Sequence, residues 1–223
     1  MSVLVAIHVV SGTLAVLAGA IAATVRKGRQ THIRAERWFV IFMTLSSLLG
    51  AALGLIRFEQ FFITFFAGIL GTYLVLSGWR AAHHGTASSA MFDAMLSAAN
   101  LLTLGALASI GVLALSRPDG QMFGFAGENY LFLAVMSGIA FLADISQAVR
   151  KSMSRKHQIA RHLWRMLLGF FIAAGSAFTG PGASVFPEAI QASGILSLPE
   201  LSILLPMIFY LSKTLFFSSN RET

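Results

Sequence analysis

Residues 157–180, HQIARHLWRMLLGFFIAAGSAFTG, begin with two histidines and two arginines and then stay apolar for the length of a membrane span. On a helix, a stripe of small and polar residues falls on one face. These residues are His162, Met166, Gly169, Ala173, Ser176 and Gly180. Such a narrow stripe is typical of a helix that packs closely against other membrane helices. The stretch therefore predicts a bundle of transmembrane helices.

The composition extends this prediction to the whole chain. Of its 223 residues, 56% are hydrophobic and only 11% are charged, and the mean hydropathy is +0.76. Soluble domains carry about 25% charged residues, so a soluble domain is excluded. The apolar residues come in blocks of about twenty, the length that crosses a hydrocarbon core of roughly 30 Å. We expect a single transmembrane domain over residues 1–223.

Seven of these blocks predict an all-α, polytopic membrane protein, a bundle of seven transmembrane helices. The predicted spans are about 2–25, 38–56, 61–79, 93–115, 129–149, 163–179 and 201–217. Residues 182–199 are also apolar, but proline and glycine interrupt them. This segment is expected to form an interfacial or re-entrant loop.

The distribution of basic residues predicts the orientation of the bundle. All but two of the 16 Lys and Arg residues fall on one side of the predicted membrane, and the exceptions are Arg57 and Arg117. Basic segments are retained on the cytoplasmic side, so we expect the N-terminus outside and the C-terminus inside a bacterial inner membrane. This placement explains the net charge of +7 without a nucleic-acid partner. It also predicts contact between the inner face and anionic lipid headgroups.

Ionisable groups in or beside the spans are the candidate functional residues, because each costs about 2.5–3.5 kcal/mol at mid-span. His8 lies on the small-residue face of the first span, where it either hydrogen-bonds a neighbouring helix or acts as a ligand or proton relay. All histidines except His8 fall on the inner side. There His32, Asp144 and His162 are predicted as metal ligands, with a divalent metal or haem b as the cofactor. The alternative is that these histidines lie among headgroups and that Asp144 pairs with an arginine.

Two negative observations bound the metal hypothesis. The chain contains no cysteine, so thiolate ligands are excluded. It also contains no ligand spacing such as HExxH, so any site must combine residues from different helices.

Several motifs along the chain resemble those of a known family. They are His8-x3-Gly12, Lys27-Gly28-x3-His32, Tyr73-Leu74-x3-Gly78-Trp79, Asp144 and the run His162-Leu163-Trp164-Arg165-Met166. On these residues the chain resembles a family of predicted bacterial integral membrane proteins of unknown function. The resemblance covers most of the chain and implies a helical bundle. It points to His8, His32, Asp144, His162 and Arg165 as site residues and implies no activity.

Three functions remain open at this stage. The first is a metal- or haem-binding, redox-type membrane protein with a His/Asp cluster toward the inner face, which the one-sided placement of the histidines favours. The second is a small-solute or proton-coupled transporter with Asp144 and His8 as relay groups. The third is a lipid-binding or assembly subunit without catalysis. A metal-dependent hydrolase has less support, because no hydrolase spacing accompanies serines such as Ser176.

Overall fold

The computed structural model describes residues 3–83, 90–150 and 154–217, and most of them are helical. The long helices are α1 (Val3–Thr24), α2 (Gln30–Ile56), α3 (Phe58–Ala82), α4 (Ala90–Leu115), α5 (Gly127–Val149), α6 (Arg155–Phe178) and α8 (Leu198–Ser212). With the short turns that continue α6 and α8, seven helices are long and apolar enough to cross a membrane. The all-α, multi-helix class predicted from the sequence is confirmed.

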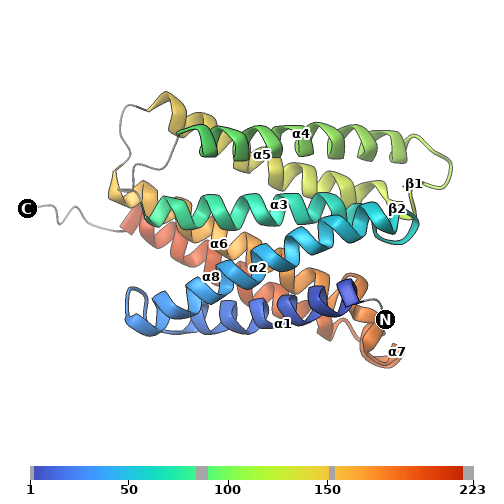
Figure 1. Cartoon of the computed structure of the whole chain (residues 1–223), viewed down its shortest axis with the longest axis horizontal. Coiled ribbons are helices and arrows are strands. Elements are labelled where there is room, and N and C mark those ends of the chain that lie inside the picture. Colours follow the sequence, from blue (N-terminus) through green and yellow to red (C-terminus); the bar gives the residue numbers. More distant parts are fainter. Residues whose placement is uncertain (1–2, 84–89, 151–153, 218–223) are drawn as a thin grey trace, which may run out of the picture.

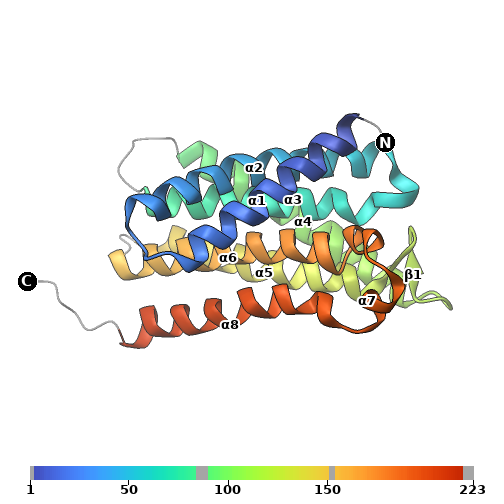
Figure 2. The ribbon, with the colours of Figure 1, turned by 90° about the horizontal axis from the view of Figure 1, so that it is seen from below.

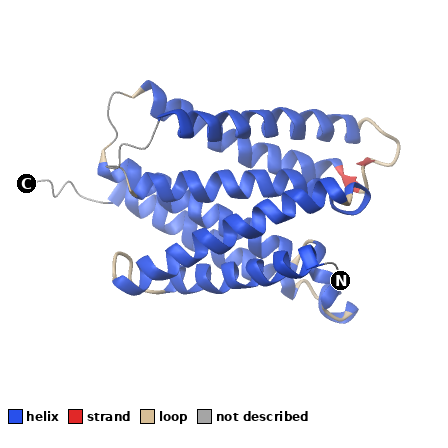
Figure 3. Ribbon diagram, viewed as in Figure 1, coloured by secondary structure: helices blue, strands red, loops and turns tan. Residues whose placement is uncertain are grey.

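Successive long helices run in opposite directions along the bundle (Figure 1). One end holds the start of α1, the short helix α7 (Glu188–Ala192) and a small hairpin of β1 (Gln121–Met122) and β2 (Phe125–Ala126). Figure 3 shows that this hairpin supplies the only strands among the described residues. The other end holds the α1–α2 turn, the carboxyl ends of α3 and α5 and the start of α6. We call it the basic end.

Helix α3 is the most buried of the seven and forms the centre of the bundle. It packs against α2, α4, α5 and α6, and its residues Leu70, Tyr73 and Leu74 are almost completely buried. Helices α2 and α3 approach each other closely at Gly68, where an added Cβ would overlap the Ser47 carbonyl oxygen. Helix α8 lies at the margin of the bundle beside α6 (Figure 2). Helix α3 contributes the Tyr73 hydroxyl and the Gly78 carbonyl to the polar groups described below.

Two helices begin eight residues before their predicted spans, and both do so at the basic end. Helix α2 begins at Gln30, ahead of the span predicted from 38, and α6 begins at Arg155, ahead of the span predicted from 163. The sequence prediction followed the apolar blocks, whereas the helices continue through polar turns beyond those blocks. Residues 30–37 and 155–162 are therefore helical, and their side chains have fixed directions.

A tight turn joins α1 to α2 at this end. Gly28 has a φ of +78°, which L side chains rarely adopt, and nothing lies within 4 Å of the position of a Cβ there. The turn lets the Lys27 ammonium donate to the carbonyls of Ala22 and Ala23 at the end of α1. Partial burial lowers the pKa of Lys27.

The segment 182–199 consists of short helical pieces. They are a 3-10 turn at Pro181–Val185, helix α7 and a second 3-10 turn at Ile195–Ser197. None of these pieces taken alone is long enough to cross a bilayer. The interfacial or re-entrant placement of this segment stays a prediction.

Candidate metal centre and the adjacent arginine cluster

Three side chains converge between α2 and α6 at the basic end. His32 and Glu36 are four residues apart and share one face of α2, so His32 Nε2 lies 3.4 Å from Glu36 Oε2. His162 from α6 places its Nε2 3.6 Å from the same carboxylate oxygen. One donor atom from each residue lies within 4.8 Å of the other two. We call His32, Glu36 and His162 the His/Glu cluster.

Backbone carbonyls fix the orientation of both imidazoles. His32 Nδ1 lies 3.0 Å from the carbonyl oxygen of Ala22, and His162 Nδ1 lies 3.0 Å from that of Gly78. A carbonyl oxygen carries no proton, so each Nδ1 must be the N–H donor. In a neutral imidazole the lone pair is then on Nε2, the atom that faces Glu36. Metal-ligating histidines show this arrangement, with the distal nitrogen bonded to a carbonyl or carboxylate.

The carboxylate of Glu36 is only partly satisfied. Glu36 is 8% exposed, and its Oε1 has no hydrogen-bond partner within the described part of the chain. A buried carboxylate facing two nitrogen lone pairs is unfavourable until a cation lies among them. Either protons on the two imidazoles or a metal ion can supply this positive charge.

Two of the three spacings in the cluster suit a bare metal ion. Zinc bonds of 2.0–2.2 Å in tetrahedral geometry separate neighbouring ligand atoms by about 3.4 Å, close to the two measured distances in the cluster. Two histidines and one glutamate form a ligand set that leaves a further position open. Haem b fits less well. Its plane must lie between two axial imidazoles, and Glu36 Oε2 lies within 3.6 Å of both Nε2 atoms.

Asp144, the third predicted ligand, lies in a second cluster. The carboxylate beside His32 and His162 is that of Glu36. Asp144 Oδ1 accepts hydrogen bonds from Arg161 Nη2 at 2.7 Å and from Arg165 Nη2 at 2.6 Å. Its Oδ2 accepts one from the Tyr73 hydroxyl at 2.6 Å. We call Tyr73, Asp144, Arg161 and Arg165 the arginine cluster. For Asp144 the structure thus contains the arginine pairing that the sequence left as the alternative.

The remaining described histidines, His8, His83 and His157, lie apart from the His/Glu cluster. His8 Nδ1 is 2.9 Å from the Ser46 carbonyl, and the Ser46 hydroxyl donates to the His8 carbonyl at 3.2 Å. These bonds join α1 to α2 toward the other end of the bundle, as expected for the helix–helix alternative. His83 and His157 contact neighbours on or next to their own helices. His84 lies outside the described residues.

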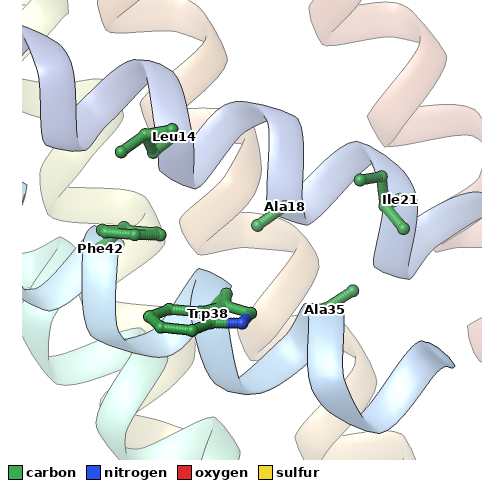
Figure 4. A pocket seen from close by; sticks show the side chains of 6 residues that line it. All are labelled: Leu14, Ala18, Ile21, Ala35, Trp38 and Phe42. Carbon is green, nitrogen blue, oxygen red and sulfur yellow. The ribbon is translucent and has the colours of Figure 1, made fainter. Parts of the chain in front are cut away.

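An apolar groove follows the contact between α1 and α2 (Figure 4). It has a volume of about 280 Å³ and is lined by Leu14, Ala18, Ile21, Ala35, Trp38 and Phe42. The lining contains no acid, base or nucleophile, so the groove offers surface for apolar chains and no chemistry of its own. The two polar clusters are therefore the candidate functional sites.

No family model, curated protein or solved structure matches this chain. The resemblance to a membrane-protein family of unknown function stays a prediction that rests on the motifs quoted above. The functional argument depends on the geometry of the two clusters.

Proposed function

We propose that this multi-pass membrane protein binds one divalent transition-metal ion through His32, Glu36 and His162. The observation that supports the proposal is the convergence of two imidazole Nε2 atoms on one buried carboxylate, with both Nδ1–H groups held by backbone carbonyls. This combination fixes the tautomer in which nitrogen lone pairs face the ion.

The ligand set limits the chemistry that the ion supplies. Imidazole and carboxylate ligands suit zinc, iron and manganese, and an open position allows a water molecule or a substrate to bind. Zinc would act as a Lewis acid, whereas iron would supply the redox chemistry predicted from the sequence. In either case His32 and His162 would hold the ion and Glu36 would offset part of its charge. The identity of the metal therefore decides between these two classes of function.

Metal analysis of the purified protein in detergent tests the proposal. We expect one ion per chain in the wild type by inductively coupled plasma mass spectrometry. We expect a loss of bound metal in His162→Ala and Glu36→Gln. His157→Ala is the matched control, because it removes a histidine from the same helix outside the cluster and should keep the ion. A chelator should also lower the Tm of the wild type and leave that of His162→Ala unchanged.

The result that contradicts the proposal is equally definite. It is a folded, monodisperse wild-type protein that stays metal-free after incubation with zinc, iron(II) and manganese(II). Equal metal content in His162→Ala and the wild type would also refute the ligand assignment.

The orientation belongs to the same proposal. We place the basic end, and with it the His/Glu cluster, on the cytoplasmic side of a bacterial inner membrane. The one-sided distribution of Lys and Arg supports this placement. Proton-coupled transport through Asp144 and His8, and a lipid-binding or assembly role without catalysis, stay predictions from the sequence.

A further inference from the structure

The arginine cluster carries more positive than negative charge. The guanidinium groups of Arg161 and Arg165 share the single carboxylate of Asp144, and the third partner, Tyr73, is an uncharged donor. The side chains of Arg161 and Asp144 are each 12% exposed, and that of Arg165 is fully buried. A buried charge without a counter-ion is unfavourable in the interior of a bundle. One negative charge is therefore missing from this cluster.

The cluster also contains unused hydrogen-bond donors. Arg165 Nε, Arg165 Nη1 and Arg161 Nη1 are buried and make no hydrogen bond to any residue that the structure describes. The Arg165 guanidinium lies over the rings of Tyr73 and Trp164, at 5.1 and 5.2 Å from their centroids. These ring faces stabilise the charge in part but do not replace a hydrogen-bond acceptor.

Asp93, another acid at this end, forms no ion pair with either guanidinium of the arginine cluster. Asp93 at the start of α4 accepts two hydrogen bonds from Arg80, at 2.6 and 2.8 Å. Its carboxylate is thus already engaged with a guanidinium of its own. Among the described residues only Asp144 forms an ion pair with Arg161 or Arg165, so a second counter-ion would come from outside them.

The position of the cluster indicates where such an anion comes from. Arg161 lies in the second turn of α6, and Asp144 lies five residues before the end of α5 at Val149. Both are at the basic end, close to where helices of this length leave the hydrocarbon core. Phosphate groups of lipids and dissolved oxyanions are present at this level. A guanidinium matches the geometry of such groups with paired N–H donors.

We propose that Arg161 and Arg165 bind one phosphate-type oxyanion, presented by an anionic lipid headgroup or free in solution. Arg165 is the fixed half of the site, because Asp144 and the Ala140 carbonyl hold its Nη2. Arg161 is the entry residue, because it is partly exposed and commits only Nη2 to Asp144. Its unused Nη1 is buried, so binding through this atom requires the Arg161 side chain to turn toward the anion. The proposal is independent of the metal centre.

Lipid retention and phosphate binding test this site in the whole protein. Native mass spectrometry in detergent containing phosphatidylglycerol and phosphatidylcholine measures which lipid stays bound. Thermal unfolding with and without inorganic phosphate measures the free oxyanion. We expect Arg161→Gln to weaken the binding of the preferred probe by about tenfold or more, since one charge-assisted contact is lost. Arg155→Gln, at an exposed position of the same helix, is the matched control and should bind like the wild type.

Each outcome decides the question. Selective retention of phosphatidylglycerol that Arg161→Gln abolishes identifies a lipid headgroup. A phosphate-dependent rise in Tm that Arg161→Gln abolishes identifies a free oxyanion. Binding of neither probe, or equal losses in Arg161→Gln and Arg155→Gln, overturns the proposal. The metal content of Arg161→Gln should equal that of the wild type, so failure of this site is distinguishable from failure of the His/Glu cluster.

Discussion

The tautomers of His32 and His162 are determined by residues that take no part in the His/Glu cluster. The carbonyls of Ala22 and Gly78 each accept a hydrogen bond from Nδ1. The first carbonyl is near the end of α1 and the second is in the last turns of α3. The Nε2 lone pair of each imidazole is thus directed toward Glu36 by a carbonyl on a helix other than its own. Packing of α1 and α3 therefore contributes directly to the chemistry of the site.

Asp144 holds two buried guanidinium groups, and its removal should be costly. We expect Asp144→Asn to lower the free energy of unfolding by about 3–5 kcal/mol, because both arginines stay buried without a carboxylate. Thermal unfolding in detergent measures the change. Asp93→Asn is the control, since the Asp93 side chain is 40% exposed and its pairing with Arg80 is screened by solvent. That variant should lose about 1 kcal/mol or less. Equal destabilisation by the two variants would contradict the assignment.

Among the elements, α6 depends on a close approach to α3 at Gly78. A Cβ at this position would lie 2.9 Å from the Cβ of Arg165 and 3.3 Å from the sulfur of Met166. We expect Gly78→Ala to destabilise the protein by about 1–3 kcal/mol, because the two helices must separate to admit the methyl group. It should also weaken metal binding, since the Gly78 carbonyl orients His162.

Thermal unfolding and metal analysis of Gly78→Ala test this prediction, and Gly105→Ala in α4 is the control. A Cβ added at Gly105 would have no described atom within 4 Å beyond its own helix backbone and chain neighbours. Its alanine variant should therefore be unchanged or more stable, by up to about 1 kcal/mol from helix propensity. A Gly78→Ala protein with wild-type stability and full metal content would show that this contact does not matter.

The sequence predicted the long helices well, because runs of about twenty apolar residues are a strong signal in one dimension. It missed Glu36, because residues 30–37 are mostly polar and fall between the predicted spans. Had α2 been extended to Gln30, the spacing of His32 and Glu36 would have placed both on one face. The partners of Asp144 were harder to find. Tyr73 is 71 residues away along the chain, and only the packing of α3 and α5 brings the two together.

For the whole molecule, the proposed orientation makes a prediction about the two ends of the bundle. A green fluorescent protein fused to the C-terminus should fluoresce, because this reporter folds in the cytoplasm. Alkaline phosphatase fused after Asp119, in the turn between α4 and the hairpin, should be active, because that turn is at the opposite end. The basis of both expectations is the retention of basic segments on the inner side. A dark C-terminal fusion together with an inactive fusion after Asp119 would reverse the proposed layout.

His162 and Arg165 are one helical turn apart on α6, and each belongs to a different cluster. A ligand that rotates or shifts α6 at one cluster must therefore displace the side chain that serves the other. If binding at one cluster shifts α6 in this way, the metal ion and the oxyanion are energetically linked, and each changes the affinity of the other by the same factor. Zinc titrations of the protein in nanodiscs of phosphatidylglycerol and of phosphatidylcholine would measure that factor. Identical zinc affinities in the two lipids would mean that the metal ion and the oxyanion are not energetically linked through α6.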